Sequence, residues 1–114
     1  EYAIRNCEPE VIGRLHVGNA LKLNFPDKCF EAVLSINTLH NLEREDLKKA
    51  IREIKRVSYD EKSFIQVDSY KTEEQKKIFE SWVLTAKYYG YPEEWIKLFN
   101  EVQYSGDWYW TIIE

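Results

Sequence analysis

The apolar run Ala32–Ile36 is the feature of this chain that most constrains its fold. It reads Ala-Val-Leu-Ser-Ile and ends a longer expected strand, Phe30–Ile36. A strand with so little polar alternation is typical of a central parallel strand that is covered on both faces. Such a strand needs neighbouring strands on both sides. The run therefore predicts a sheet that lies inside the protein, with other elements packed on it.

Three further segments are predicted as strands because they are short, rich in apolar residues and bounded by turn residues. They are Arg14–Gly18, Ser63–Asp68 and the aromatic run Gly106–Ile113. The first strand connects to Phe30–Ile36 through a loop of about ten residues without a helix, which is marginal for a parallel crossover. These two strands are therefore expected not to be neighbours, unless the first lies at an edge.

Three amphipathic helices are predicted from apolar residues that recur at three and four positions. The first is Glu43–Val57, with Asn41 as its N-cap. The second opens with the capping box Thr72–Gln75 and ends at Gly90. The third begins at Pro92. The side chains expected on their buried faces are Leu47, Ala50, Ile51, Ile54, Val57, Ile78, Phe79, Trp82, Val83, Ala86, Trp95, Ile96, Phe99 and Val102.

Strands separated by amphipathic helices imply an α/β fold with mostly parallel pairing and right-handed crossovers. A length of 114 residues fits a single domain. The segment Glu1–Glu8 is expected to be the tail of a helix, which Pro9 stops.

The composition excludes several classes of protein. Apolar residues make up 44% and charged residues 32%, an ordinary globular balance. The net charge of −4, without a basic stripe, predicts no binding to nucleic acid or to anionic membranes. No run approaches the roughly 18 apolar residues of a membrane span, and Glu1–Ile4 is not a signal peptide, so a cytoplasmic protein is expected. Cys7 and Cys29 are expected to be reduced thiols.

Polar turns follow the predicted strands and mark a candidate ligand site. They are Gly18-Asn19-Ala20, Asn37-Thr38-Leu39-His40 and Asp68-Ser69-Tyr70. In open α/β sheets the ligand crevice lies beyond the carboxyl ends of the strands. Asp68 and Tyr70 are therefore candidate substrate contacts. His40 is a weak candidate for a catalytic base, with a structural role as the alternative.

Other chemical patterns are absent or have a simpler interpretation. No cluster of His, Cys or carboxylate residues has metal-ligand spacing, and no nucleophile has a partnered base, so no metal site is predicted. His16 is expected to point outward from its strand. The aromatic residues favour core packing and an interface, with a cage for a cationic or flat substrate as the alternative. They are Trp82, Tyr88, Tyr89, Tyr91, Trp95, Tyr104, Trp108, Tyr109 and Trp110.

The segment Gly18–Val33, with the strand that runs on through Leu42, resembles a sequence block of class I S-adenosylmethionine-dependent methyltransferases. In that family the block reads GDA-x-x-LPFPD-x-SFD-x-V. The helix end Ala50–Val57 is similar to the family's R-E-x-x-R-V, and Phe64–Val67 to its next strand. The segment Tyr91–Tyr104 is similar to the late helix of the family and the strand after it. The resemblance covers essentially the whole chain.

The resemblance implies S-adenosylmethionine as cofactor and a role for three residues in binding it. The acidic residue of the family's GDA turn accepts a hydrogen bond from the adenine amino group, and Asn19 stands in its place. Asparagine keeps an acceptor but loses the charge. The backbone of Ala20 would line the same adenine pocket. Asn37, with Thr38 and His40 after it, falls where the family's fourth strand opens toward cofactor and acceptor.

The sequence also departs from the family. The family begins with a strand, a glycine-rich loop and a second strand that together hold most of the cofactor, whereas the four glycines here are scattered. The turn Tyr59–Glu61 replaces a usual Pro-Gly-Gly. In the family's sheet the two missing strands lie between the strands joined by the loop from Gly18 to Cys29. The fold class expected is thus an incomplete Rossmann-like methyltransferase sheet, with residues 1–114 as a single partial domain.

Two functions follow from the resemblance. The first is a methyltransferase fragment that acts on a small molecule and is weak or inactive alone. Methyl transfer needs mainly alignment of the acceptor, so the absence of a catalytic motif is no objection. The second is a non-catalytic methyltransferase-like module for binding or dimerisation. A different nucleotide-binding α/β domain ranks below both. Because open sheet edges recruit other chains, a homodimer through the exposed edges is expected.

Overall fold

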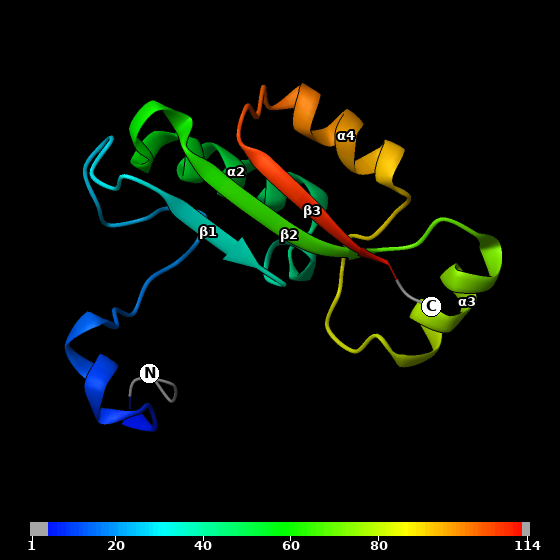
Figure 1. Cartoon of the computed structure of the whole chain (residues 1–114), viewed down its shortest axis with the longest axis horizontal. Coiled ribbons are helices and arrows are strands. Elements are labelled where there is room, and N and C mark those ends of the chain that lie inside the picture. Colours follow the sequence, from blue (N-terminus) through cyan, green and yellow to red (C-terminus); the bar gives the residue numbers. More distant parts are fainter. Residues whose placement is uncertain (1–4, 113–114) are drawn as a thin grey trace.

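The computed structural model describes residues 5–112, which form an open three-stranded sheet with helices packed against it (Figure 1). The strands lie in the order β1-β2-β3, and both neighbouring pairs are parallel. The elements along the chain are η1 (Pro9–Arg14), β1 (Val33–Ile36), η2 (Leu39–Asn41), α2 (Arg44–Val57), η3 (Tyr59–Glu61), β2 (Ser63–Ser69), α3 (Glu73–Trp82), α4 (Pro92–Glu101) and β3 (Asp107–Ile112). The predicted α/β class with parallel pairing is confirmed, as a partial Rossmann-like sheet.

The core lies between the sheet and two helices, α2 and α4. Leu47 and Ile51 of α2 and Trp95 of α4 are completely buried, and they share one apolar cluster with Ile65 and Val67 of β2. Burial of one such aliphatic side chain contributes about 1.5–3 kcal/mol. The periodicity of α2 therefore predicts its place in the fold correctly, because its apolar stripe is the surface that packs on β2.

The other face of the sheet carries no helix in the part of the chain that the structure describes. Leu34 and Ile36 of β1 and Tyr109 of β3 are exposed on this side. The expectation that Ala32–Ile36 is covered on both faces is therefore wrong for the described residues. The physical reason is that α2 and α4 both pack on the opposite face, where they bury Ile65.

The predicted strand Arg14–Gly18 is also wrong. Pro9–Arg14 forms a 3-10 helix, residues 15–18 have no regular structure, and only an isolated bridge joins Asn19 to Lys22. A strand needs a partner to satisfy its backbone groups, and none of the described strands lies beside this segment. Of the predicted helix Glu1–Glu8, residues 1–4 lie outside the described part.

The starts of β1 and α2 differ from the expected ones. β1 begins at Val33 rather than Phe30, which makes only an isolated bridge to Ser58. Glu43, not Asn41, occupies the N-cap position of α2. Asn41 instead accepts a hydrogen bond from the Thr85 hydroxyl at 2.8 Å, and so fastens the loop after α3 to η2.

Helix α3 is shorter than predicted. Its N-cap is as expected, since the Thr72 hydroxyl accepts from the amide of Gln75 at 3.1 Å. The Gln75 side chain accepts from the amide of Lys71, not from that of Thr72, so the reciprocal half of the box is displaced by one residue. The helix ends at Trp82 instead of Gly90, and only Phe79 is buried. With a single buried anchor, little packing favours a longer helix.

Helix α4 begins at Pro92 as predicted and buries Leu98 where Ile96 was expected. Arg44 of α2 donates two hydrogen bonds of 2.7 Å to the carboxylate of Glu101, which ties the two helices together at the surface. Among the described helices, none combines the length and the apolar character needed to cross a membrane.

The layered core predicts where substitutions matter. Leu47→Ala should lower the free energy of unfolding by about 2–5 kcal/mol, because it leaves a cavity between α2 and the sheet. Val17→Ala is the control, since Val17 is 62% exposed in the loop before β1, and it should change stability by no more than about 0.5 kcal/mol. Urea denaturation followed by circular dichroism measures both, and equal losses would contradict the packing described.

Candidate functional site

An apolar cavity of about 220 Å³ lies on the free side of β1, opposite β2. Its walls come from the loop before β1, from β1 itself, from the turn after it and from α2. The lining residues are Ala20, Leu23, Val33, Leu34, Ser35, Thr38, Leu39, Ala50 and Ile54. Two hydroxyl side chains, those of Ser35 and Thr38, interrupt an otherwise hydrocarbon surface. Such a lining suits a mostly apolar group.

A tight turn at Asn19 brings Ala20 to this cavity. The Asn19 side-chain oxygen accepts from the amide of Leu21 at 2.9 Å, and its backbone oxygen accepts from the amide of Lys22 at 3.0 Å. Asn19 itself is exposed and is not among the lining residues. Its side-chain acceptor, predicted for adenine, is thus already engaged in the turn.

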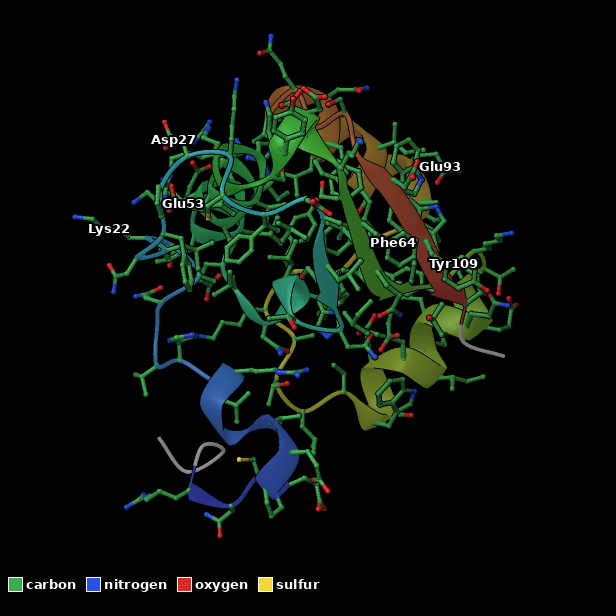
Figure 2. The ribbon with its side chains drawn as sticks, turned by 60° about the vertical axis from the view of Figure 1, so that its left-hand side comes forward. Lys22, Asp27, Glu53, Phe64, Glu93 and Tyr109 are labelled. Carbon is green, nitrogen blue, oxygen red and sulfur yellow. The ribbon has the colours of Figure 1, made fainter. Side chains whose placement is uncertain are left out.

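Arg56 holds the rest of this loop on α2. Its guanidinium donates to the backbone oxygens of Leu23 and Phe25 at 3.0 and 2.8 Å and to the Asp27 carboxylate at 2.8 Å. It also donates to both oxygens of the Glu53 carboxylate at 2.9 Å. We call Asp27, Glu53 and Arg56 the Arg56 clamp. In Figure 2, Asp27 lies above Glu53 where the loop passes over α2.

Glu53 is the acceptor at the centre of the clamp. Besides Arg56, it accepts from the amide of Leu23 at 2.7 Å. These bonds, that from Arg56 above all, lower the pKa of Glu53 although partial burial opposes the shift. The charge of Glu53 therefore persists at neutral pH and fixes Leu23, a lining residue of the cavity.

Asn37 ends β1 in a left-handed backbone conformation, with φ at 49°, which asparagine tolerates better than most residues. Its amide is shared between the backbone oxygen and the side-chain oxygen of Gln66, both at 3.0 Å. Gln66 in turn donates to the hydroxyl of Thr111 at 2.5 Å. This chain of bonds links the three strands near their carboxyl ends and leaves Asn37 exposed beside the cavity residue Thr38.

His40 is 8% exposed, and its Nδ1 atom is buried without a hydrogen-bond partner among the described residues. Burial lowers the pKa of His40, while the carboxylate of Asp68 partly opposes that shift. The imidazole is therefore neutral at pH 7 and able to take up a proton. The structure thus brings two of the predicted site residues, His40 and Asp68, within electrostatic reach of each other.

Tyr70 lies apart from the cavity. Its ring is 2% exposed and packs on Tyr91, Phe79 and Tyr89 at centroid distances of 4.8, 5.7 and 6.4 Å. Burial raises the pKa of its hydroxyl. Most of the other predicted aromatic residues also make ring contacts, for example Tyr88 on Trp95 at 4.8 Å, whereas Tyr109 is 59% exposed. These ring contacts agree with core packing rather than with a substrate cage.

The Arg56 clamp is the part of the site that sequence reasoning missed. A signal was present, because Glu53 and Arg56 lie three residues apart and flank Ile54 on the apolar side of α2. Long charged side chains so close to a buried stripe indicate a partner beyond the helix. The partner, a loop about thirty residues earlier, could not be read from the sequence.

Two further findings concern metals and thiols. Within residues 5–112, no three His, Cys, Asp or Glu side chains are grouped so that they could hold a metal ion. Cys7 and Cys29 are not joined in a disulfide.

Comparison with known proteins gives one match. A family model described as "Methyltransferase domain" matches residues 1–65, more than half of the 114 residues. The matched span contains the loop, β1, α2 and the start of β2, and so all residues that line the cavity. Neither the curated proteins nor the solved structures give a match.

The clamp predicts that Arg56→Lys loosens the loop. Lysine keeps the positive charge but cannot present the fork of donors that Glu53 and the loop carbonyls share. The amide of Leu23 should then exchange with solvent several-fold faster in hydrogen-exchange NMR. Arg52→Lys is the matched control on the exposed side of the same helix. Unchanged protection of Leu23 in Arg56→Lys would show that the clamp does not hold the loop.

The environment of His40 predicts its titration. The chain has two histidines, so His16→Asn leaves a single imidazole signal in the NMR spectrum. Its titration midpoint should lie below the ordinary value of 6.5. Asp68→Asn should lower it further, because the carboxylate that stabilises the imidazolium is removed. A midpoint that does not move in Asp68→Asn would mean that the two groups do not interact.

Proposed function

This chain belongs to the methyltransferase domain family, and on that premise we propose that the cavity beside β1 receives the adenine ring of S-adenosylmethionine. The domain would then take part in methyl transfer to a small molecule. The observation that carries the proposal is the position of Ala20, which lines the cavity together with Leu23, β1 and Thr38.

The size and chemistry of the cavity support an aromatic ring rather than a whole cofactor. Its volume of about 220 Å³ lies below the roughly 300–1,000 Å³ of pockets that enclose an entire ligand. Leu23, Leu39 and Ile54 offer apolar surface to the faces of a ring. Ser35 and Thr38 add hydroxyl groups to the lining. That of Thr38 donates to the backbone oxygen of Ile36 at 2.8 Å and keeps its capacity to accept. The ribose and the amino acid part would lie outside this cavity.

We propose that binding by this chain is weak. The Asn19 acceptor is engaged by the amide of Leu21, so a hydrogen bond to the adenine amino group must compete with the turn. The second lone pair of the same oxygen remains available. A neutral amide oxygen also accepts less strongly than a carboxylate.

His40 and Asp68 are proposed to act on the acceptor side. When bound, S-adenosylmethionine supplies an electrophilic methyl group on a sulfonium. A neutral His40 near the carboxyl ends of β1 and β2 can accept the proton that a hydroxyl or amine acceptor loses, and Asp68 stabilises the resulting imidazolium. Asn37 is proposed to border the cofactor at the end of β1.

Binding of adenosine, S-adenosylmethionine and S-adenosylhomocysteine tests the proposal. All three ligands share the adenine ring, so each should shift the amide signals of Ala20 and Thr38 with a Kd on the order of 1 mM, equivalent to about −4 kcal/mol. Ala20→Phe should abolish these shifts because the larger side chain fills the cavity. Isothermal titration calorimetry gives an independent measure of the affinity for S-adenosylmethionine and S-adenosylhomocysteine.

The matched control is Ala86→Phe, an equally half-buried position in the loop between α3 and α4 that does not line the cavity. It should bind as the unaltered chain does. If millimolar ligand produces neither heat nor shifts in the unaltered chain, the cavity is not a cofactor site. The non-catalytic binding or dimerisation module is then the better interpretation of the domain.

A further inference from the structure

Two sets of exposed apolar side chains lie on different parts of the molecule. The first set, which we call the bare sheet face, is the side of the sheet away from α2 and α4. Its apolar side chains are those of Leu34, Ile36 and Tyr109, which are 71%, 52% and 59% exposed, and that of the half-buried Phe64. Gln66, 8% exposed, lies between Ile36 and Tyr109 on this face. Phe64 and Tyr109 lie on neighbouring strands in Figure 2.

The second set, which we call the α3 stripe, consists of Ile78, Trp82 and Leu84. Ile78 and Trp82 are one helical turn apart and are 43% and 46% exposed, and Leu84 follows the helix at 95%. The helix lies beyond the carboxyl end of β2, away from the layers of the core (Figure 1). It is attached through Phe79, which packs on Tyr70 and Tyr89.

The total exposed area is larger than a compact monomer requires. The chain exposes 7,856 Å², whereas a compact protein of its mass exposes about 6,600 Å². Its radius of gyration, 15.2 Å, likewise exceeds the about 13 Å of a compact domain of this length. The excess area of about 1,300 Å² is more than the roughly 800 Å² that each partner buries in a stable complex. One further association of ordinary size would therefore account for it.

The two sets are complementary in kind. A parallel sheet is normally covered by helices on both faces. The bare sheet face has no covering helix, and the apolar side chains of the α3 stripe have no sheet to pack on. A helix of ten residues is about 15 Å long. This length fits along β2, whose seven residues span about 23 Å.

We propose that two copies of this chain form a two-fold symmetric dimer in which the α3 stripe of each copy covers the bare sheet face of the other. A two-fold axis repeats the contact between helix and sheet. The α3 stripe of the first copy then packs on the sheet of the second, and that of the second on the sheet of the first. In this arrangement the exposed edges of the sheet do not form the main contact between the two copies. The sheet face is the interface.

The helix of the same chain is held away from its own sheet. Tyr91 donates a hydrogen bond of 2.5 Å to the carboxylate of Glu73, at the first turn of α3. Ser69 donates to the backbone oxygen of Gly90 at 2.8 Å. Together with the packing of Phe79 on Tyr70, these contacts hold α3 beyond the strand ends. A second copy is therefore the partner that can bring such a helix to the bare sheet face.

Sedimentation velocity at micromolar concentration tests the dimer. The unaltered chain should sediment with twice its monomer mass of 13.7 kDa. Ile36→Lys on the sheet face and Trp82→Glu on α3 should each weaken dimerisation at least about tenfold, since each buries a charge in both contacts. Ile96→Lys is the matched control, because Ile96 is exposed on α4 and belongs to neither set. Far-UV circular dichroism checks that all three variants fold.

Mixing the two weakened variants distinguishes this dimer from others. In the mixed pair one contact consists of the unaltered helix and the unaltered face, and the other sets the two introduced opposite charges against each other. Equal amounts of Ile36→Lys and Trp82→Glu should therefore form dimers that neither forms alone. Pairing through the β1 edge would be sensitive to Ile36→Lys but not to Trp82→Glu. Sensitivity to Ile36→Lys alone would overturn the proposal. So would an unaltered chain that is monomeric, or a mixture of the two variants that stays monomeric.

Discussion

The forked pairing of Arg56 is the interaction on which the candidate site depends. A guanidinium has five N–H donors, and Arg56 makes five hydrogen bonds, to Glu53, Asp27 and two backbone oxygens. The loop that it binds has almost no regular structure, so its backbone groups must find partners elsewhere. The buried apolar residues of α2 fix that helix in the core, and Arg56 holds the loop against it. Ala20 and Leu23 of this loop form one wall of the cavity.

The sequence predicts those parts of the fold that follow from periodicity within one segment. Helix α2, strands β2 and β3 and the start of α4 at Pro92 all lie close to where they were expected. Prediction fails where an element depends on a distant partner. The segment Arg14–Gly18 has the pattern of a strand but no strand to pair with. In the same way, the run Ala32–Ile36 indicates a buried strand, but cannot reveal that a helix covers just one of its faces.

The residues of the candidate site differ in the same way in how well the sequence predicts them. The resemblance leads from the sequence to Ala20, which lies at the cavity, and to His40. The position at the end of a strand leads to Asp68, which interacts electrostatically with His40. The same rule on strand ends leads to Tyr70, whose ring packs in an aromatic cluster with Phe79, Tyr89 and Tyr91 instead. The clamp escapes prediction because its contacts join residues about thirty positions apart. Local patterns identify which residues are candidates, and long-range packing decides which of them face a ligand.

Leu34 belongs to two surfaces at once. It lines the cavity beside β1, and it is the most exposed residue of the bare sheet face. A ligand bound in the cavity and a second copy bound on the sheet face would therefore both contact Leu34. Thermodynamic linkage makes such a coupling reciprocal. If dimerisation changes the affinity for the ligand by some factor, the ligand changes the affinity of the two copies for each other by the same factor. A single leucine would thus join nucleotide recognition and self-association in one equilibrium.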